Sequence, residues 1–271
     1  MKNNKIALVT GASSGIGAAT ARRLAQAGYA VYGTSRRASQ AGAAAASHAM
    51  LALDVTSDAS VAAAVAEVMR REGRIDLLVN NAGFGVAPAG AEESSVAQAQ
   101  AIFDTNFYGV VRMTLAVLPH MRAQGGGRIL NIGSVVGFLP MPYGALYSAT
   151  KHAIEGYTES LDHEVRGWGI RASVIEPAYT KTTFEANLLA PDAPLSAYRQ
   201  VRADVTRRLQ ALMAGADDPG VVADTILAAA RASHPTLRYT AGPLAARLRL
   251  MRRFLPAALM DAGLRKDLRL A

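Results

Sequence analysis

A glycine-rich turn near the start of the chain constrains the fold more than any other feature. Residues 10–17 read Thr-Gly-Ala-Ser-Ser-Gly-Ile-Gly, between an apolar run at 5–9 and an alanine-rich segment at 18–25. A buried strand, a glycine turn and a helix ending near Gly28 are typical of the start of a nucleotide-binding βαβ unit. The glycines would let the main chain approach a pyrophosphate at the positive helix N-terminus. The spacing is not the commoner Gly-x-Gly-x-x-Gly, and an ordinary flexible turn is the alternative.

Strand-like and helix-like segments alternate along most of the rest of the chain. We expect strands at 30–34, 49–55, 75–80, 128–132 and 170–176, and helices at 61–71, 101–121 and 147–165. The alanine run 41–46 is interpreted as helix rather than linker. This alternation predicts an α/β fold, a single doubly wound Rossmann domain over 1–271 with about seven parallel strands and helices on both faces.

The composition agrees with a globular domain and limits the chemistry. Hydrophobic residues make up 51% of the 271 residues, enough for a large core. The absence of cysteine excludes disulfides and thiolate metal sites. The histidines form no ligand cluster, so no metal is predicted. Because a strand already begins by Lys5 and no apolar run is long enough to span a membrane, we expect no signal peptide and a cytoplasmic protein.

The positive charge is concentrated at the C-terminus. The net charge is +8, and the segment 238–271 holds eight arginine or lysine residues against two aspartates. We interpret this basic C-terminal extension as a helix that packs on the domain and exposes its arginines. The alternative is an amphipathic helix in weak contact with an anionic membrane surface. Nucleic acid is not an expected partner, because a basic tail is not a recognition motif.

A tyrosine and a lysine four residues apart point to acid–base chemistry. Tyr147 and Lys151 share one face of the helix expected at 147–165, roughly 5–6 Å apart. An ammonium beside a phenol is expected to lower the phenol pKa from its usual value near 10. Such a phenol can exchange a proton with a carbonyl or alcohol oxygen. Ser134, thirteen residues upstream, can donate a hydrogen bond that positions this oxygen.

These motifs together resemble the short-chain dehydrogenase/reductase family. The resemblance is strong over about 5–185 and also includes the Asn-Asn-Ala-Gly sequence at 80–83. It implies a catalytic tetrad of Asn106, Ser134, Tyr147 and Lys151, in which Asn106 holds a water that links the lysine to solvent. The sequence 143–166 is similar to the branch near retinol and 17β-hydroxysteroid dehydrogenases. The family resemblance alone also predicts a homodimer or homotetramer.

The end of the second expected strand indicates which dinucleotide is bound. NAD-preferring enzymes usually place a carboxylate there, whereas this chain has Ser35 followed by Arg36 and Arg37. Guanidinium groups bind phosphate well, which favours the 2′-phosphate of NADP. The alternative is a pair of arginines that face solvent. With the family positions included, the residues predicted to bind NADP are Gly11, Ser13, Ser14, Ile16, Gly17, Arg36, Arg37, Asp54, Val55, Asn81, Ala82, Gly83, Tyr147, Lys151, Pro177, Thr180 and Thr182.

One position departs from the family pattern. The family usually has Pro-Gly after the sixth strand, and this chain has Pro177-Ala178. Alanine resists positive φ, so the local main chain or the nicotinamide tilt is expected to differ without loss of binding.

The residues around the expected site are mostly apolar, and this predicts an apolar ketone or aldehyde as substrate rather than a sugar or a phosphate ester. The segment 178–214 breaks the alternation of strands and helices and is interpreted as a substrate lid that excludes water. The residues predicted to contact substrate are Ser134, Val136, Phe138, Tyr143, Tyr147 and Phe184.

The predicted function is NADP-dependent hydride transfer, with reduction favoured. The alternative is an NADP-binding sensor or scaffold with little catalysis.

Overall fold

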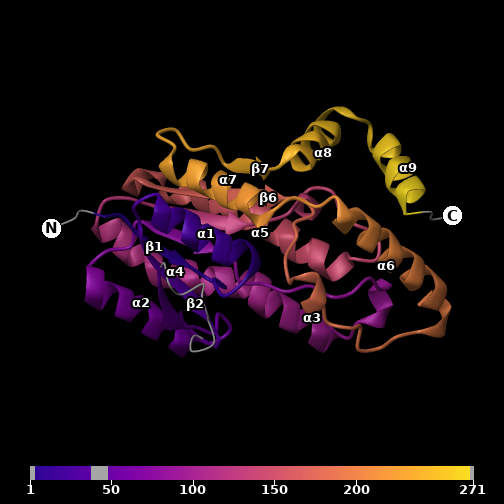
Figure 1. The fold of residues 1–271 in the computed structure, drawn as a ribbon, viewed down its shortest axis with the longest axis horizontal. Helices are drawn as coiled ribbons and strands as arrows, with labels where there is room; N and C mark the ends of the chain where they lie inside the picture. The colour runs from indigo at the N-terminus through magenta and orange to yellow at the C-terminus, as the bar shows by residue number, and fades with distance from the viewer. Residues whose placement is uncertain (1–3, 38–47, 269–271) are drawn as a thin grey trace.

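A single parallel sheet organises the molecule. In a computed structural model that describes residues 4–37 and 48–268, seven strands pair in the order β3-β2-β1-β4-β5-β6-β7, all parallel (Figure 1). The strands are β1 (Ile6–Val9), β2 (Ala30–Ser35), β3 (Ala49–Ala52), β4 (Leu77–Asn80), β5 (Gly127–Ile132), β6 (Ile170–Pro177) and β7 (Arg238–Ala241). The predicted doubly wound α/β fold is confirmed. The alanine run 41–46, interpreted as helix, lies outside the described residues.

Successive residues of β1 show why the sheet is covered on both faces. Ile6 and Leu8 belong to one core cluster, while Ala7 and Val9 belong to the other. Because alternate side chains leave a strand on opposite sides, an uninterrupted apolar strand needs helices on both faces. The first cluster packs α2 (Asp58–Glu72), α4 (Gly109–Ala123) and α5 (Ala145–Val165) on the sheet, and the second packs α1 (Gly15–Gln26) and α7 (Pro219–Arg231).

The long helix expected at 101–121 is interrupted once. It consists of α3 (Val96–Phe103), a wide π turn (Asp104–Tyr108) and α4. Such turns insert one residue into a helix and are frequent at functional sites. The turn contains Asn106, which is buried.

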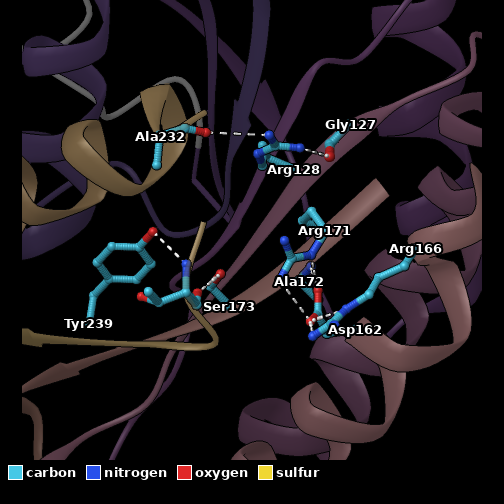
Figure 2. Close-up of polar contacts among 10 residues, drawn as sticks. Gly127, Arg128, Asp162, Arg166, Arg171, Ala172, Ser173, Ala232 and Tyr239 are labelled. Carbon is cyan, nitrogen blue, oxygen red and sulfur yellow. Dashed lines mark hydrogen bonds and ion pairs between the residues drawn. The ribbon is translucent and has the colours of Figure 1, made fainter. Parts of the chain in front are cut away.

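An ionic cluster ties α5 to the amino end of β6, away from the glycine turn. Asp162 of α5 is fully buried and accepts hydrogen bonds from Arg166, Arg171 and the Ala172 N–H (Figure 2). Arg128 of β5, which pairs with Arg171 across the sheet, donates to the Gly127 carbonyl at 3.1 Å. Burial alone would raise the pKa of Asp162, but hydrogen bonds from Arg171, Arg166 and Ala172 lower it.

The C-terminal part holds elements that the sequence did not locate. They are α6 (Arg199–Ala214), α7, β7, α8 (Pro243–Phe254) and α9 (Ala257–Asp267). Since β7 is the edge strand of the sheet, the basic segment beyond the sheet starts at Gly242 rather than at Arg238. Helices α8 and α9 follow β7 along one side of the molecule (Figure 1). Among the described residues, no helix is both long and apolar enough to cross a membrane.

Candidate active site

The predicted site residues follow the carboxyl ends of six strands. The order of the sheet reverses between β1 and β4, and in open α/β sheets ligands bind at this switch point. There the Thr10 hydroxyl accepts from the N–H groups of Asn81 and Ala82 at 2.9 and 3.0 Å. The turn after β1 and the turn after β4 are therefore held together where a dinucleotide is expected.

The glycine turn is shaped for close approach of main chains. Gly11 and Gly15 have φ of +66° and +53°, which side chains disfavour. A Cβ on Gly17 would lie 2.2 Å from the Gly11 carbonyl oxygen and 2.5 Å from Asn81 Nδ2. The same Asn81 Nδ2 donates to the carbonyls of Thr10 and Gly11 at 2.8 and 3.1 Å. Three glycines and one amide thus define the path of this turn.

The start of α1 fits the pyrophosphate of a dinucleotide. Ser14 is the N-cap of α1, and its side chain makes no capping hydrogen bond to the helix. First-turn N–H groups and the helix dipole favour an anion at such a terminus. Ser13 and Ser14 are exposed there, and Ile16 packs partly on the core. The residues present at this terminus therefore fit the pyrophosphate of a dinucleotide.

Residues after β2 and β3 would surround the adenosine end. Arg36 and Arg37 are exposed, and the Arg37 N–H donates to the Ser35 hydroxyl at 3.2 Å. Asp54 accepts from the Thr56 N–H and hydroxyl at 3.0 and 2.8 Å, and these bonds lower the pKa of Asp54. Val55 is buried against Gly109, whose added Cβ would lie 2.8 Å from it.

The first turns of α5 bring three of the tetrad residues together. Lys151 Nζ lies 5.5 Å from the centroid of the Tyr147 ring and donates to the Ile132 carbonyl at 2.8 Å. Ser134 follows β5, and its hydroxyl donates to the Pro177 carbonyl at 3.5 Å. A hydrogen bond between the side chains of Ser134 and Tyr147 lowers the phenol pKa. Serine, tyrosine and lysine therefore face one position, as the spacing predicts.

The electrostatics of this group differ from the expectation that the lysine lowers the tyrosine pKa. Burial raises the pKa of Tyr147 above its usual range, and only the Ser134 hydrogen bond opposes that rise. Burial is therefore the dominant cause, and the Lys151 ammonium donates to the Ile132 main-chain carbonyl. Burial lowers the pKa of Lys151 to about 8, although the charge of Glu155 raises it.

Asn106 reaches the same group through an intermediate threonine. Asn106 accepts from the Phe84 N–H at 3.0 Å and donates to the Phe84 carbonyl at 2.8 Å. It also donates to the Thr150 hydroxyl at 3.3 Å, and Thr150 donates to the Tyr147 carbonyl at 2.8 Å. A Cβ added to Gly83 would lie 3.0 Å from Asn106 Oδ1, so this position leaves little room for a side chain. Thr150 is a linking residue that the motif comparison missed, although it directly precedes Lys151.

The segment after β6 keeps ordinary backbone geometry. Tyr143 is the only non-glycine residue with positive φ in the described part of the chain, so Ala178 needs no glycine-like conformation. Thr180 donates to the Ala178 carbonyl at 3.2 Å, and Thr182 accepts from the Phe184 N–H at 3.1 Å. Thr182 also lies beside Gly15, whose added Cβ would be 3.1 Å away.

The predicted substrate residues do not all surround Tyr147. Phe184 does, with ring centroids 5.6 Å apart. Tyr143, at φ +60°, packs instead on Tyr198 at 6.4 Å. Phe138 lies under the Arg249 guanidinium of α8, and the Val136 N–H donates to the Ser134 hydroxyl at 3.3 Å. The structure thus brings one aromatic wall to the phenol and directs Phe138 toward α8.

The predicted lid is bound to the segment that follows β4. The Leu189 N–H donates to the Gly85 carbonyl at 3.0 Å, and the Ala87 N–H donates to the Leu189 carbonyl at 2.8 Å. Glu93 is fully buried and accepts from the Leu195 N–H at 2.8 Å and from Arg202. A buried carboxylate thus anchors the 178–214 segment, an arrangement that no local sequence pattern indicates.

A groove of about 790 Å³ lies on the outer side of this region, between α1, α7 and residues 181–183. Gly15 and Thr182 line it, but among its described lining residues there is no member of the tetrad. It therefore touches one edge of the cofactor position and is not where a substrate could meet Tyr147.

Known proteins match both the sequence and the fold. The family model for short chain dehydrogenase matches residues 5–193. The 3-ketodihydrosphingosine reductase of Bacteroides thetaiotaomicron is 43% identical over 183 residues, which cover 68% of this chain and 66% of that protein. Human 17-beta-hydroxysteroid dehydrogenase type 1 is 38% identical over 255 residues, which cover 86% of this chain and 76% of that protein.

Solved structures agree with these relatives. A short-chain dehydrogenase from Streptomyces avermitilis has a TM-score of 0.83 and 32% identity, with 98% of this chain and 96% of that chain covered. A Brucella melitensis 3-ketoacyl-(acyl-carrier-protein) reductase was solved with NADH (TM-score 0.73, 27% identity, coverage 89% and 99%). A metagenomic short-chain oxidoreductase was solved with NADP (TM-score 0.69, 28% identity, coverage 87% and 96%). The chain therefore belongs to the short-chain dehydrogenase family of nicotinamide-dependent oxidoreductases, in a branch that resembles the 17β-hydroxysteroid dehydrogenases.

Proposed function

We propose that this protein uses NADPH to reduce the carbonyl group of a bulky apolar ketone or aldehyde. The observation that carries the proposal is the grouping of Tyr147 with Ser134, Lys151 and Phe184 at the carboxyl ends of β5 and β6. Two polar donors and one ammonium lie there beside an aromatic wall. This arrangement suits a reacting oxygen that gains negative charge while the rest of the substrate stays out of water.

The tetrad side chains have separate tasks in this mechanism. A bound nicotinamide supplies the hydride. Tyr147 Oη donates a proton to the substrate oxygen, and Ser134 holds that oxygen by a hydrogen bond. Because burial raises the pKa of Tyr147, the phenol is protonated at neutral pH and can act as the acid that reduction requires. Lys151, with its pKa at about 8, carries a positive charge at neutral pH and would bind the ribose of the nicotinamide.

The preference for NADP is supported by Arg36 and Arg37 at the end of β2. Both side chains are exposed, and no carboxylate occupies position 35. Exchange of both arginines for glutamine should lower kcat/KM with NADPH by about 10- to 100-fold, because two charge-assisted contacts to the 2′-phosphate are lost. The value with NADH should stay within about 2-fold. Equal losses with both cofactors would contradict this assignment.

Bulky apolar substrates are supported by the aromatic surroundings of the phenol and by two relatives. Phe184 packs on Tyr147, while Tyr143 and Tyr198 form a second aromatic pair. The relatives named as a 3-ketodihydrosphingosine reductase and a 17-beta-hydroxysteroid dehydrogenase agree with carbonyl chemistry. Asn106 would hold the water that links Lys151 to solvent.

The surface supports two further proposals about partners. Val96, Tyr108 and Leu115 of the α3–α4 helix are exposed apolar residues, and they support self-association as a homodimer or homotetramer.

Leu250, Phe254 and Leu259 of α8 and α9 are also exposed, among basic residues, and they support weak contact with an anionic membrane. Exchange of Phe254 for glutamate should reduce co-sedimentation with anionic vesicles, whereas unchanged binding would remove the membrane proposal.

Cofactor oxidation measured with NADPH and NADH tests the main proposal. The carbonyl panel would run from small aldehydes to long-chain ketones, ketosteroids and retinal. The matched control is Tyr147→Phe, which keeps the ring contact with Phe184 and removes the proton donor. We expect turnover of bulky apolar carbonyls that Tyr147→Phe abolishes without loss of NADPH binding. Turnover that survives Tyr147→Phe would refute the mechanism, and tight NADPH binding without turnover of any carbonyl would favour a sensor.

A further inference from the structure

Two carboxyl groups are buried side by side next to Lys151, and the mechanism above does not use them. Glu176 is fully buried near the end of β6, directly before Pro177, whose carbonyl accepts from Ser134. Glu155 is also buried, on α5, one helical turn after Lys151. A carboxylate inside an apolar strand is costly unless its charge is balanced or neutralised. The charges of these two acids must therefore be balanced by neighbouring cations or removed by a proton.

Two arginines from the C-terminal part each occupy one oxygen of the pair. Arg238 Nε of β7 donates to Glu155 Oε2 at 2.8 Å and lies 3.8 Å from Glu176 Oε1, and Arg249 Nη1 of α8 donates to the same Glu176 oxygen at 2.7 Å. Glu159 takes the other side of Arg238, with an Nη2–Oε2 distance of 2.7 Å. The positive charge is thus shared among three carboxylates, so the two arginines do not neutralise the buried pair by themselves.

The other two oxygens of the pair lack a hydrogen-bond donor. With both acids ionised, Glu155 Oε1 and Glu176 Oε2 are buried without a hydrogen-bond donor among the residues that the structure describes. An ionised carboxylate only accepts, but a protonated one can donate to its neighbour. Burial and the charge of Glu155 raise the pKa of Glu176 to about 8, despite the opposing charges of Arg249 and Arg238. A single proton shared between the two carboxyl groups would supply a donor where none is present and remove one of two like charges.

We propose that Glu155 and Glu176 hold one proton between them at neutral pH. The negative charge that remains on this carboxyl pair would favour the protonated, positively charged form of Lys151. Glu155 lies one turn below Lys151 and favours its charged form, whereas burial favours the neutral form. The groups that face the pair are Lys151 and Glu159 of α5, Arg238 of β7 and Arg249 of α8. Glu155 and Glu176 are thus positioning residues, and their effect on turnover rests on the role proposed for Lys151.

The shared proton can be observed without any catalysis. Infrared spectra of the full-length protein at neutral pH should show a carboxylic-acid carbonyl band that shifts when glutamate is labelled with carbon-13. Glu176→Gln should remove the band, because its amide can replace the proton as a donor to Glu155. Glu159→Gln is the matched control: it contacts the same Arg238 from a half-exposed side chain and should keep the band. Absence of the band in the wild-type protein, or its survival in Glu176→Gln, would overturn the proposal.

The effect on Lys151 has its own measurement. The chain contains only five lysines, so Lys151 can be followed by NMR of labelled lysine side chains and identified by its low pKa. Glu155→Gln should lower the Lys151 pKa by about one unit, since the opposing anion is removed. Glu159→Gln should leave it unchanged. If Glu155→Gln does not fold, the Lys151 pKa is measured in Glu176→Gln, where it should stay close to the wild-type value because Glu155 is still present; a clear drop in that variant would overturn the proposal.

These readouts separate this inference from the proposed function. A band and a Lys151 shift in a protein that reduces no carbonyl would confirm the pair and refute the enzyme proposal. Tyrosine-dependent turnover with no band, or with a Lys151 pKa that ignores Glu155→Gln, would refute the pair and leave the enzyme proposal intact. Where turnover is present, Glu155→Gln should also move the alkaline limb of kcat/KM for reduction to lower pH by about one unit.

Discussion

The guanidinium carbon of Arg249 lies 4.8 Å from the centroid of the Phe138 ring. The same side chain donates to buried Glu176, and Arg252, one turn later on α8, donates to the Phe138 carbonyl at 3.1 Å. Helix α8 is therefore held against the segment that follows Ser134. The arginines of the basic segment thus do more than face solvent, because at least two of them attach this helix to the site.

Loss of the Arg249 contact should destabilise the protein and weaken substrate binding. In Arg249→Met the buried Glu176 loses the arginine that donates to it, and we expect a loss of about 2 kcal/mol in the free energy of unfolding. The loss should grow at alkaline pH, where Glu176 would otherwise ionise. Urea unfolding and KM would be measured, with Arg247→Met, an exposed position on the same helix, as the control. Identical stability in the two variants would contradict the assignment.

Gly17→Ala should abolish tight NADPH binding. An added Cβ would lie 2.2 Å from the Gly11 carbonyl oxygen, so the glycine turn must move away from its position before α1. We expect the Kd for NADPH to rise more than about 100-fold, a change of about 3 kcal/mol. Gly156→Ala is the control, because its added Cβ meets nothing within 4 Å, and this helix position should gain about 0.5–1 kcal/mol. Fluorescence titration with NADPH would compare them.

Asp162→Asn should make the fold less stable at neutral pH and less sensitive to acid. The folded pKa of Asp162 lies below the unfolded value of 3.8, so the ionised group stabilises the fold above that value. This contribution is lost as the pH falls through the folded pKa. We expect the variant to lose about 3 kcal/mol at neutral pH and less than that at about pH 3, where the carboxylate has begun to lose its contribution.

The matched control for this cluster is Asp224→Asn, which breaks an exposed ion pair with Arg23. Exposed pairs contribute about 0–1 kcal/mol, so its unfolding curve should stay near that of the wild type. Urea unfolding at both pH values gives the comparison. A constant difference between Asp162→Asn and the wild type across that range would show that the carboxylate charge is not what stabilises the cluster.

Glu93→Gln should loosen the 178–214 segment. The buried carboxylate accepts from the Gly90 and Leu195 N–H groups and from Arg202, and the amide can replace only part of this set. We expect KM for the carbonyl substrate to rise about 10-fold and proteolysis of the segment to speed up. Glu92→Gln, which alters an exposed contact with Tyr198, is the control. Equal proteolysis of both variants would rule out the anchoring role.

The features that could be predicted from the sequence are those formed by residues close together in the chain. The glycine turn and the Tyr147–Lys151 pair are short motifs whose spacing the chemistry requires, and the structure places them at one edge of the sheet. Arg36, Arg37 and the tetrad roles stay predictions, since their test is binding and turnover. The family, the parallel sheet and the helices on both faces are confirmed.

What the sequence did not reveal depends on contacts between distant segments. Strand β7 is four residues of mixed polarity, Arg-Tyr-Thr-Ala, and becomes a strand only because β6 offers it an edge. The sequence predicted a lowered Tyr147 pKa, whereas burial raises it, and spacing alone shows neither that burial nor the hydrogen bond from Lys151 to Ile132. The Glu155–Glu176 pair joins α5 to β6, although a lone glutamate within the apolar strand 170–176 was a usable signal.

The π turn at Asp104–Tyr108 has a consequence for the whole of its helix. One additional residue in a helix rotates everything after it by about 100°, so α3 and α4 cannot share a single apolar stripe. The turn lets α3 lie near the lid while α4 presents Met113, Val117 and Met121 to the core beneath the sheet. A one-residue deletion here would preserve Asn106 yet turn a different side of α4 inward. The length of this turn is therefore as much a requirement of the site as the identity of the residue within it.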